Sequence, residues 1–150
     1  MKDYNGFTGA QRLRAQRWLT EMWSAGRLQR PVECCACGQR EGALDAHAED
    51  YSEPFAPGKT DEFHLCFRCH MMVHNRFAVP AAFEHYRVCV AGGIRFEAML
   101  RRNWWLFRAQ HLTVRVTVKY TIHDPPRHDV LGQIAARDGA QLRDPADAPG

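Results

Sequence analysis

Four cysteines fall into two pairs whose spacing is typical of a zinc site. Two residues separate the members of each pair, so both sulfurs of a pair can reach one ion. Four thiolates close a tetrahedral site, and zinc bound there is structural because its binding free energy contributes to folding. The alternative is two sets of buried thiols, which the spacing disfavours. We therefore predict a structural Zn²⁺ bound by Cys34, Cys37, Cys66 and Cys69.

The first pair leaves a choice open, because its sequence is Cys-Cys-Ala-Cys. Cys35 would be the alternative to Cys34, but the gap from Cys35 to Cys37 is shorter, which favours Cys34. Gly38 follows directly and permits the positive φ that a tight turn between two ligands needs.

Three histidines are candidates for a second metal site. A single histidine is more often a surface or satisfied core residue, so only their combination is informative. His70 and His74 are four residues apart, which places them on one face of a helix anchored by Cys69. Three imidazoles leave coordination positions open, as a hydrolytic metal site requires. We predict a second divalent ion, Mg²⁺, Mn²⁺, Ni²⁺ or Zn²⁺, on His47, His70 and His74.

A short hairpin and a helix must position these ligands. Alternation of period two predicts a strand at residues 43–48, with Asp45 and His47 on one face. A second strand is expected at residues 62–66, and a helix follows it directly and ends before Pro80. The face that carries His47 would then look onto this helix.

Helices are also expected on both sides of this unit. Residues 8–25 have apolar positions at helical spacing, with Thr8 as N-cap and Gly26 at the C-terminal end. The later segments are expected to be a helix from Pro80 to about residue 89, a helix at 96–111, a half-buried strand at 113–123, and a mostly disordered tail at 124–150 with one helical turn near 130–136.

Composition indicates one globular domain with a tail. The chain has 150 residues, of which 45% are hydrophobic, and it has neither an apolar leader nor a long apolar run. We therefore expect a cytoplasmic protein without a membrane partner. Residues 87–119 hold seven basic groups and one acidic group, whereas residues 40–62 hold two and seven. A basic face is thus conceivable near 87–119, although a solvated helix surface explains the same charges.

The stretch "CCACGQREGALDAHAEDYSEPF", followed later by "HLCFRCHMMVH", resembles the zinc-bearing HNH endonucleases. It is most similar to the small bacterial and phage variety with the pattern His-His-x-Asp-Tyr-Ser-x-Pro. The resemblance covers about residues 32–76 and implies an α+β protein with a ββα-metal, treble-clef-like unit flanked by helices. Together with the sequence patterns outside it, this unit divides the chain into an N-terminal helix at 1–30, the zinc-binding unit at 31–79, a helical extension with a strand at 80–123, and the tail at 124–150.

The resemblance also implies roles for individual residues. The two cysteine pairs would hold the structural zinc, and His47, His70 and His74 the catalytic ion. The second histidine of the family's doublet is the general base, and that position is Ala48 in this chain. Possible substitutes for the base are Glu49, Asp50 and His64. The phosphate-binding candidates are Arg68 and Arg76.

Two readings of function follow. The first is a metal-dependent nuclease that hydrolyses phosphodiester bonds of nucleic acid, weakened or inactive because the base is missing. The second is a non-catalytic zinc-binding module for nucleic acid or protein interaction. In a further alternative the histidines are structural and the aromatic segment around Trp104 and Trp105 docks a partner. The sequence gives no indication of oligomeric state.

Overall fold

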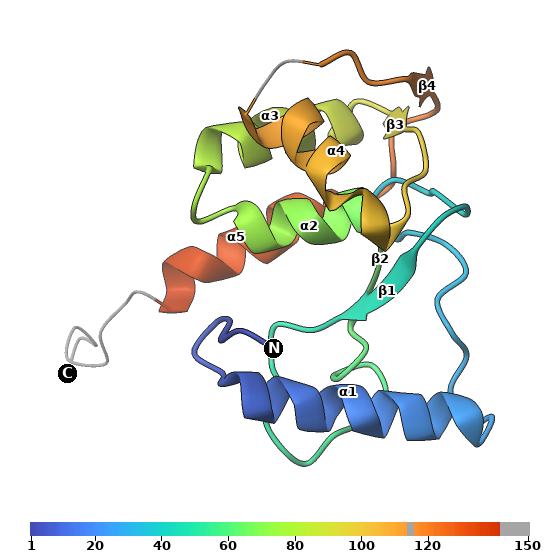
Figure 1. Ribbon diagram of the computed structural model, residues 1–150, viewed down its shortest axis with the longest axis vertical. Helices are drawn as coiled ribbons and strands as arrows, with labels where there is room; N and C mark the ends of the chain where they lie inside the picture. Colours follow the sequence, from blue (N-terminus) through green and yellow to red (C-terminus); the bar gives the residue numbers. More distant parts are fainter. Residues whose placement is uncertain (114–115, 142–150) are drawn as a thin grey trace.

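The computed structural model describes residues 1–113 and 116–141. The helices that follow the first β-hairpin gather around one core, and the N-terminal helix lies across the other side of that hairpin (Figure 1). The α+β class is confirmed, because these helices combine with two small antiparallel sheets. Within the described residues, every helix falls short of the length and hydropathy needed to cross a lipid bilayer.

The first helix, α1 (Gly9–Ser24), begins at a capping box. Gln11 donates its backbone N–H to the Thr8 hydroxyl, and the Gln11 side chain accepts from the Thr8 backbone N–H. Gly26 has a φ of +68°, which ends the helix in the left-handed conformation that glycine tolerates best. Only Ala15 and Leu19 are buried along α1, so this helix rests on the rest of the molecule by one narrow stripe.

The hairpin consists of β1 (Leu44–His47) and β2 (Phe63–Cys66), paired antiparallel. In this register His47 lies opposite Phe63, and Leu44 lies opposite Cys66. Helix α2 (Phe67–Asn75) follows β2 without a break, as the sequence predicts. The hairpin therefore carries one ligand of each expected site to the start of the helix that carries the others.

Helix α2 lies at the centre of the core, with Cys69, Met72 and Val73 fully buried. Helix α3 (Pro80–Ala91) packs against it and begins at the proline that the sequence indicates. Other large side chains in this core include Phe83, Tyr86, Phe107, Leu131 and Ile134. The core thus immobilises the helix that carries one of the clustered cysteines and two of the clustered histidines.

The expected helix at 96–111 and strand at 113–123 are wrong in detail. Strand β3 (Ile94–Phe96) pairs with β4 (Tyr120–Ile122), and Tyr120 and Ile122 are 55% and 74% exposed rather than half-buried. A strand pairs only where a partner exists, and β3 is too short to pair with more of the segment. Between the two strands come a 3-10 turn (Arg101–Asn103), α4 (Trp104–Arg108) and a π-helical turn (Ala109–Thr113), whereas residues 114–115 lie outside the described part.

The expectation of a mostly disordered tail at 124–150 is corrected for residues 130–141, because the single helical turn expected near 130–136 is part of a full helix, α5 (Val130–Gln141). The Asp129 carboxylate accepts from the Gly132 backbone N–H, an N-cap contact that the Asp-rich composition concealed. Val130, Leu131 and Ile134 are buried in the core, and α5 packs on α2. Residues 142–150 lie outside the described part of the chain.

Candidate metal centres

Four cysteine sulfurs converge where the first cysteine turn meets the start of α2. The Sγ atoms of Cys34, Cys37, Cys66 and Cys69 all lie within 4.8 Å of one another. The Cys37 and Cys66 sulfurs are 3.7 Å apart. Zn–S bonds of ~2.3 Å in a tetrahedron place neighbouring sulfurs ~3.8 Å apart, so this spacing fits a structural zinc. Cys35 is exposed and stays outside the cluster, which settles the choice between it and Cys34.

The turn that presents the first pair depends on Gly38. Its φ is +76°, and its backbone N–H donates to the Cys34 carbonyl at 2.8 Å. A Cβ at this position would also approach Nη2 of Arg95 to 2.5 Å. Arg95 in turn donates to the Cys37 carbonyl at 2.8 Å. The turn therefore depends on the positive φ of Gly38 and on this hydrogen bond from Arg95.

Three imidazoles form a second cluster beside the hairpin. One ring nitrogen each from His47, His70 and His74 lies within 4.8 Å of the other two. Nε2 of His70 and Nε2 of His74 are 3.0 Å apart. Two nitrogens bound to one tetrahedral ion at ~2.1 Å would be ~3.4 Å apart, so the observed separation is close to that of a metal site. The β1 strand supplies His47, and the i, i+4 spacing on α2 supplies the other two.

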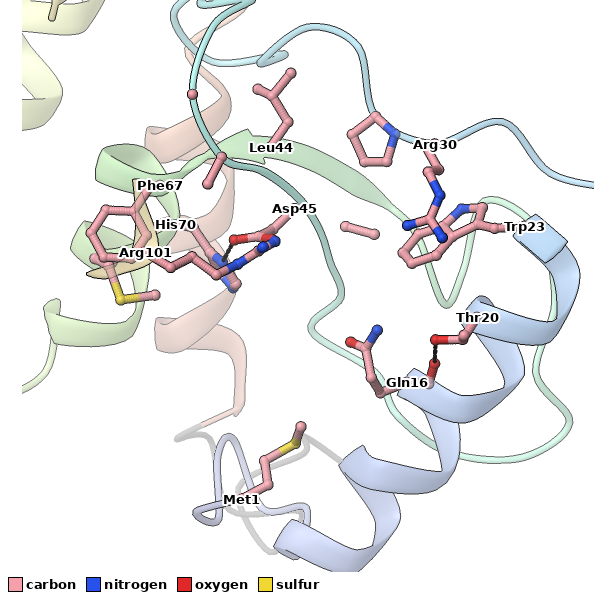
Figure 2. Close-up of a pocket in the computed structure, with 15 residues that line it drawn as sticks. Met1, Gln16, Thr20, Trp23, Arg30, Leu44, Asp45, Phe67, His70 and Arg101 are labelled. Carbon is pink, nitrogen blue, oxygen red and sulfur yellow. Dashed lines mark hydrogen bonds and ion pairs between the residues drawn. The ribbon is translucent and has the colours of Figure 1, made fainter. Parts of the chain in front are cut away.

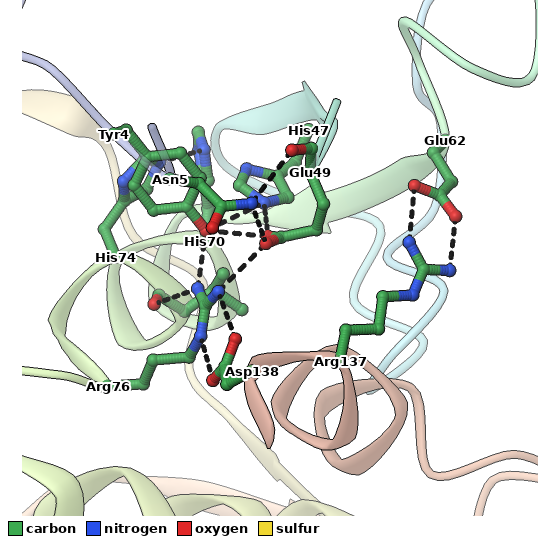
Figure 3. A network of polar contacts seen from close by, with 11 residues as sticks. Tyr4, Asn5, His47, Glu49, Glu62, His70, His74, Arg76, Arg137 and Asp138 are labelled. Carbon is green, nitrogen blue, oxygen red and sulfur yellow. Dashed lines mark hydrogen bonds and ion pairs between the residues drawn. The ribbon is translucent and has the colours of Figure 1, made fainter. Parts of the chain in front are cut away.

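Carboxylates hold the outer nitrogens of two of these rings. Asp45 Oδ2 lies 3.0 Å from His70 Nδ1, and the Arg101 guanidinium pairs with the same carboxylate (Figure 2). Glu49 Oε1 lies 2.7 Å from His47 Nε2 (Figure 3). Histidines that bind metals usually have such a partner, which fixes the ring orientation and raises its basicity. His47 Nδ1 is buried and has no hydrogen-bond partner among the described residues, so this nitrogen is left available to an ion.

Burial keeps the three imidazoles neutral. Desolvation lowers the pKa of His47 to about 4 and that of His70 to about 4. The pKa of His74 falls to about 2, first through desolvation and then through the neighbouring His70 and His47. Neutral imidazole is the form that binds a metal ion. The donor set, its burial and the carboxylate partners therefore fit a divalent ion.

A buried polar network closes the site toward the N-terminus. The Tyr4 ring lies 4.4 Å from the His74 ring, and its hydroxyl donates to Glu49 Oε1 at 2.7 Å (Figure 3). Burial raises the pKa of Tyr4, and the charge of Glu49 raises it further, so Tyr4 stays a neutral donor. Burial alone would raise the pKa of Glu49, but hydrogen bonds from His47 and Tyr4 hold it below its usual value. Glu49 is therefore an anion committed to this network.

Both arginines expected to bind phosphate lie inside the protein, each 3% exposed. Arg68 donates to the Glu97 carbonyl at 2.7 Å and to the Gln110 side chain at 2.6 Å. Arg76 forms a two-point ion pair with Asp138 of α5 at 2.9 and 3.0 Å, and a further pair with Glu49. Burial and these internal contacts indicate a structural role for both arginines and leave the expected phosphate contact without support.

Most of the positions considered for a general base lie away from the histidine cluster. Ala48 is fully buried, so a larger side chain there would have to displace its neighbours. Asp50 is half-exposed and lies 3.7 Å from the Lys59 ammonium. His64 lies on β2 opposite Ala46, next to Asp61 at 3.8 Å. Of the three proposed substitutes, only Glu49 reaches the site, and there it holds His47.

Sequence reasoning missed three members of the site. Asp45 contacts His70. Its period-two spacing predicts that it shares the strand face of His47, and this spacing is the signal that could have indicated the contact. Tyr4 and Asp138 lie far from the hairpin in sequence, and no local pattern links them to it.

The chain matches no protein-family model. It also matches no curated protein and no solved structure. The interpretation of function therefore rests on the chemistry of the two clusters.

Proposed function

We propose that the protein is an HNH-type, metal-dependent nuclease that hydrolyses phosphodiester bonds of nucleic acid. The observation that carries this proposal is the convergence of His47, His70 and His74 on a hairpin and helix that the cysteine cluster holds together. Cysteine sulfurs supply all four ligands of the first centre, as in structural zinc sites. Within the described part of the chain, the second centre offers three nitrogen donors, as in sites that also accept water or substrate.

The residues of this chain would divide the work as follows. His47, His70 and His74 would hold a divalent ion, Mg²⁺, Mn²⁺, Ni²⁺ or Zn²⁺. Asp45 and Glu49 accept from the outer nitrogens of two imidazoles and keep the ligating nitrogens aimed at one point. When bound, such an ion polarises a phosphate oxygen and lowers the pKa of water at the site.

Proton removal is the weak point of this proposed enzyme. Ala48 carries no base, and Glu49 is occupied by His47, Tyr4 and Arg76. A positioned general base is typically worth ~10²–10⁴ in rate. We therefore expect slow cleavage that rises with pH, because hydroxide or bulk buffer must supply what the missing side chain does not.

Plasmid nicking tests the proposal. Purified zinc-loaded protein is incubated with supercoiled DNA and each of Mg²⁺, Mn²⁺, Ni²⁺ and Zn²⁺, beside His70→Ala and the matched control His64→Ala. Cleavage by wild type and His64→Ala, together with loss in His70→Ala, supports the nuclease. Equal cleavage by His70→Ala indicates a contaminant, and an inert wild type with a filled histidine site rejects the enzyme.

A non-catalytic zinc module for nucleic acid or protein interaction is the second candidate. Two observations favour it. Ala48 occupies the position where the family has its base, and the Tyr4 side chain, itself 8% exposed, packs against the histidine cluster. This candidate predicts DNA binding that weakens steeply with salt but no cleavage with any of the four metals. If neither binding nor cleavage is seen, the protein-interaction form of the module remains.

A further inference from the structure

A cleft of about 880 Å³ separates α1 from the hairpin and the start of α2. Trp23 and Arg30 lie on one side, and Asp45, His70 and Arg101 lie on the other (Figure 2). His70 belongs to the histidine cluster, so the cleft leads from open solvent to the wall of the candidate catalytic site. Its volume is in the range of ~300–1,000 Å³ in which proteins hold small ligands or short segments of larger ones.

The charges along the cleft favour an anion. Among the described residues that line it, Asp45 is the sole carboxylate, and that carboxylate is already paired with His70 and Arg101. Arg101 is 66% exposed along its side chain, and its remaining N–H groups are available to a ligand. Arg30 is exposed and has no carboxylate partner among the described ion pairs. Two guanidinium groups on opposite walls suit a chain of phosphates.

The aromatic surface of the cleft restricts the form of nucleic acid it can accept. The Arg30 guanidinium carbon lies over the Trp23 ring, 4.8 Å from its centroid, so the cation and the indole form a stack at the cleft wall. Trp23 stacks on no other aromatic ring in the described part of the chain. A nucleobase can reach a recessed indole or guanidinium plane only when it is not stacked within a duplex. Duplex DNA presents its phosphates and groove edges instead.

We infer that this cleft binds an unpaired segment of nucleic acid, with a base stacked against the Trp23–Arg30 pair and the backbone phosphates running from Arg30 past Arg101 to His70. The inference rests on the proposed nuclease function for the class of ligand, and it assigns α1 the role of selecting single-stranded or locally opened substrate. The α1 segment lies outside the zinc-binding unit, so this specificity is a property that the unit alone would lack.

Fluorescence anisotropy tests the inference on the full-length zinc-loaded protein without added divalent ions. The probes are a labelled oligonucleotide of about ten nucleotides and the same strand annealed to its complement. We expect tighter binding of the single strand, a loss of roughly tenfold in Trp23→Ala, and near-complete rescue in Trp23→Phe. Arg30→Ala with Arg101→Ala should also flatten the salt dependence of binding, by a slope of about one for each lost phosphate contact.

The matched control is the double variant Arg17→Ala with Arg27→Ala, which removes two exposed charges near α1 but outside the cleft. An equal loss in this control, equal affinity for the duplex, or unchanged binding in both Trp23 variants would overturn the inference. Thermal unfolding of each variant separates lost binding from lost folding. Cleavage is scored independently: cleavage without cleft-dependent binding rejects the cleft alone, and cleft-dependent binding without cleavage rejects the nuclease alone.

Discussion

Asp45 Oδ2 lies 3.0 Å from His70 Nδ1, so a carboxylate on β1 fixes the orientation of an imidazole on α2. This contact leaves His70 Nε2 directed at His74 Nε2, 3.0 Å away. Glu49, two residues after the end of β1, contacts the His47 imidazole in the same manner. The histidine cluster is thus held by a second layer of charged groups, which a chance gathering of histidines on a protein surface would not need.

Replacement of Asp45 should weaken metal binding at the histidine cluster. Asp45→Asn removes the negative charge that holds His70, and loss of such a partner typically costs ~10–100-fold in metal affinity. Competition dialysis with a chelator measures this affinity, and the cysteine-bound zinc should be unaffected. Asp50→Asn is the control, because Asp50 is exposed and lies outside the network. An affinity identical to wild type would show that the Asp45 contact has no part in binding.

Loss of one cysteine ligand should unfold the central unit. Cys69 is fully buried within the core as well as in the cysteine cluster, so Cys69→Ser removes a zinc ligand from α2. We expect loss of about one zinc per chain and loss of the cooperative thermal transition, followed by circular dichroism. Cys35→Ser, which alters an exposed thiol outside the cluster, should keep both. A folded, zinc-free Cys69→Ser protein would contradict the structural role of this site.

The ligand-bearing elements were predictable because their signals are local. The spacing of two cysteine pairs, the i, i+4 histidines and the alternation of residues 43–48 each depend on neighbours in sequence. The structure accordingly has β1, β2 and α2 in the expected order. Local periodicity was also sufficient for α1, where Thr8 begins the helix through its capping box.

What escaped prediction depends on contacts between distant segments. The alternation of residues 113–123 resembles a strand, but among the described residues of this segment the paired strand is limited to Tyr120–Ile122, so the shortness of β3 overrules propensity. Arg76 is a phosphate-binding candidate by its sequence position, but it is buried in an ion pair with Asp138 of α5, sixty-two residues later. A composition rich in Pro and Asp likewise concealed the full length of α5. This helix is stabilised by burying its apolar face against α2, a contact that the local sequence does not indicate.

Removal of the Arg76 guanidinium should destabilise the protein strongly. Arg76→Ala leaves Glu49 and Asp138 without their shared cation in a buried setting, and breaking such a pair costs ~3–5 kcal/mol. Arg137→Ala, which breaks a more exposed pair with Glu62, should cost only ~0–1 kcal/mol. Urea denaturation of both variants gives the two free energies of unfolding. Similar values for the two would contradict the structural role of Arg76.

Acid should destabilise the protein partly through His111. Burial, and then the charge of Arg68, lower its pKa from 6.5 to about 4, and Arg68 lies 2.9 Å from its Nε2. Below pH 6.5 His111 becomes protonated in the unfolded chain but stays neutral in the folded protein. The free energy of unfolding therefore falls as the pH is lowered, until the pH approaches about 4. His111→Gln should therefore lose less stability than wild type over this interval, measured by urea denaturation. His128→Gln, which removes an exposed histidine, is the control; a slope in His111→Gln as steep as wild type would refute the assignment.

Metal content tests the central claim most directly. After saturation with Zn²⁺ and removal of weakly held ions by gel filtration, elemental analysis of wild type should give two ions per chain, one for each cluster. His70→Ala should keep its fold and give one, whereas His64→Ala should give two. One ion per chain in wild type and in His70→Ala alike would show that the three histidines do not form a metal site.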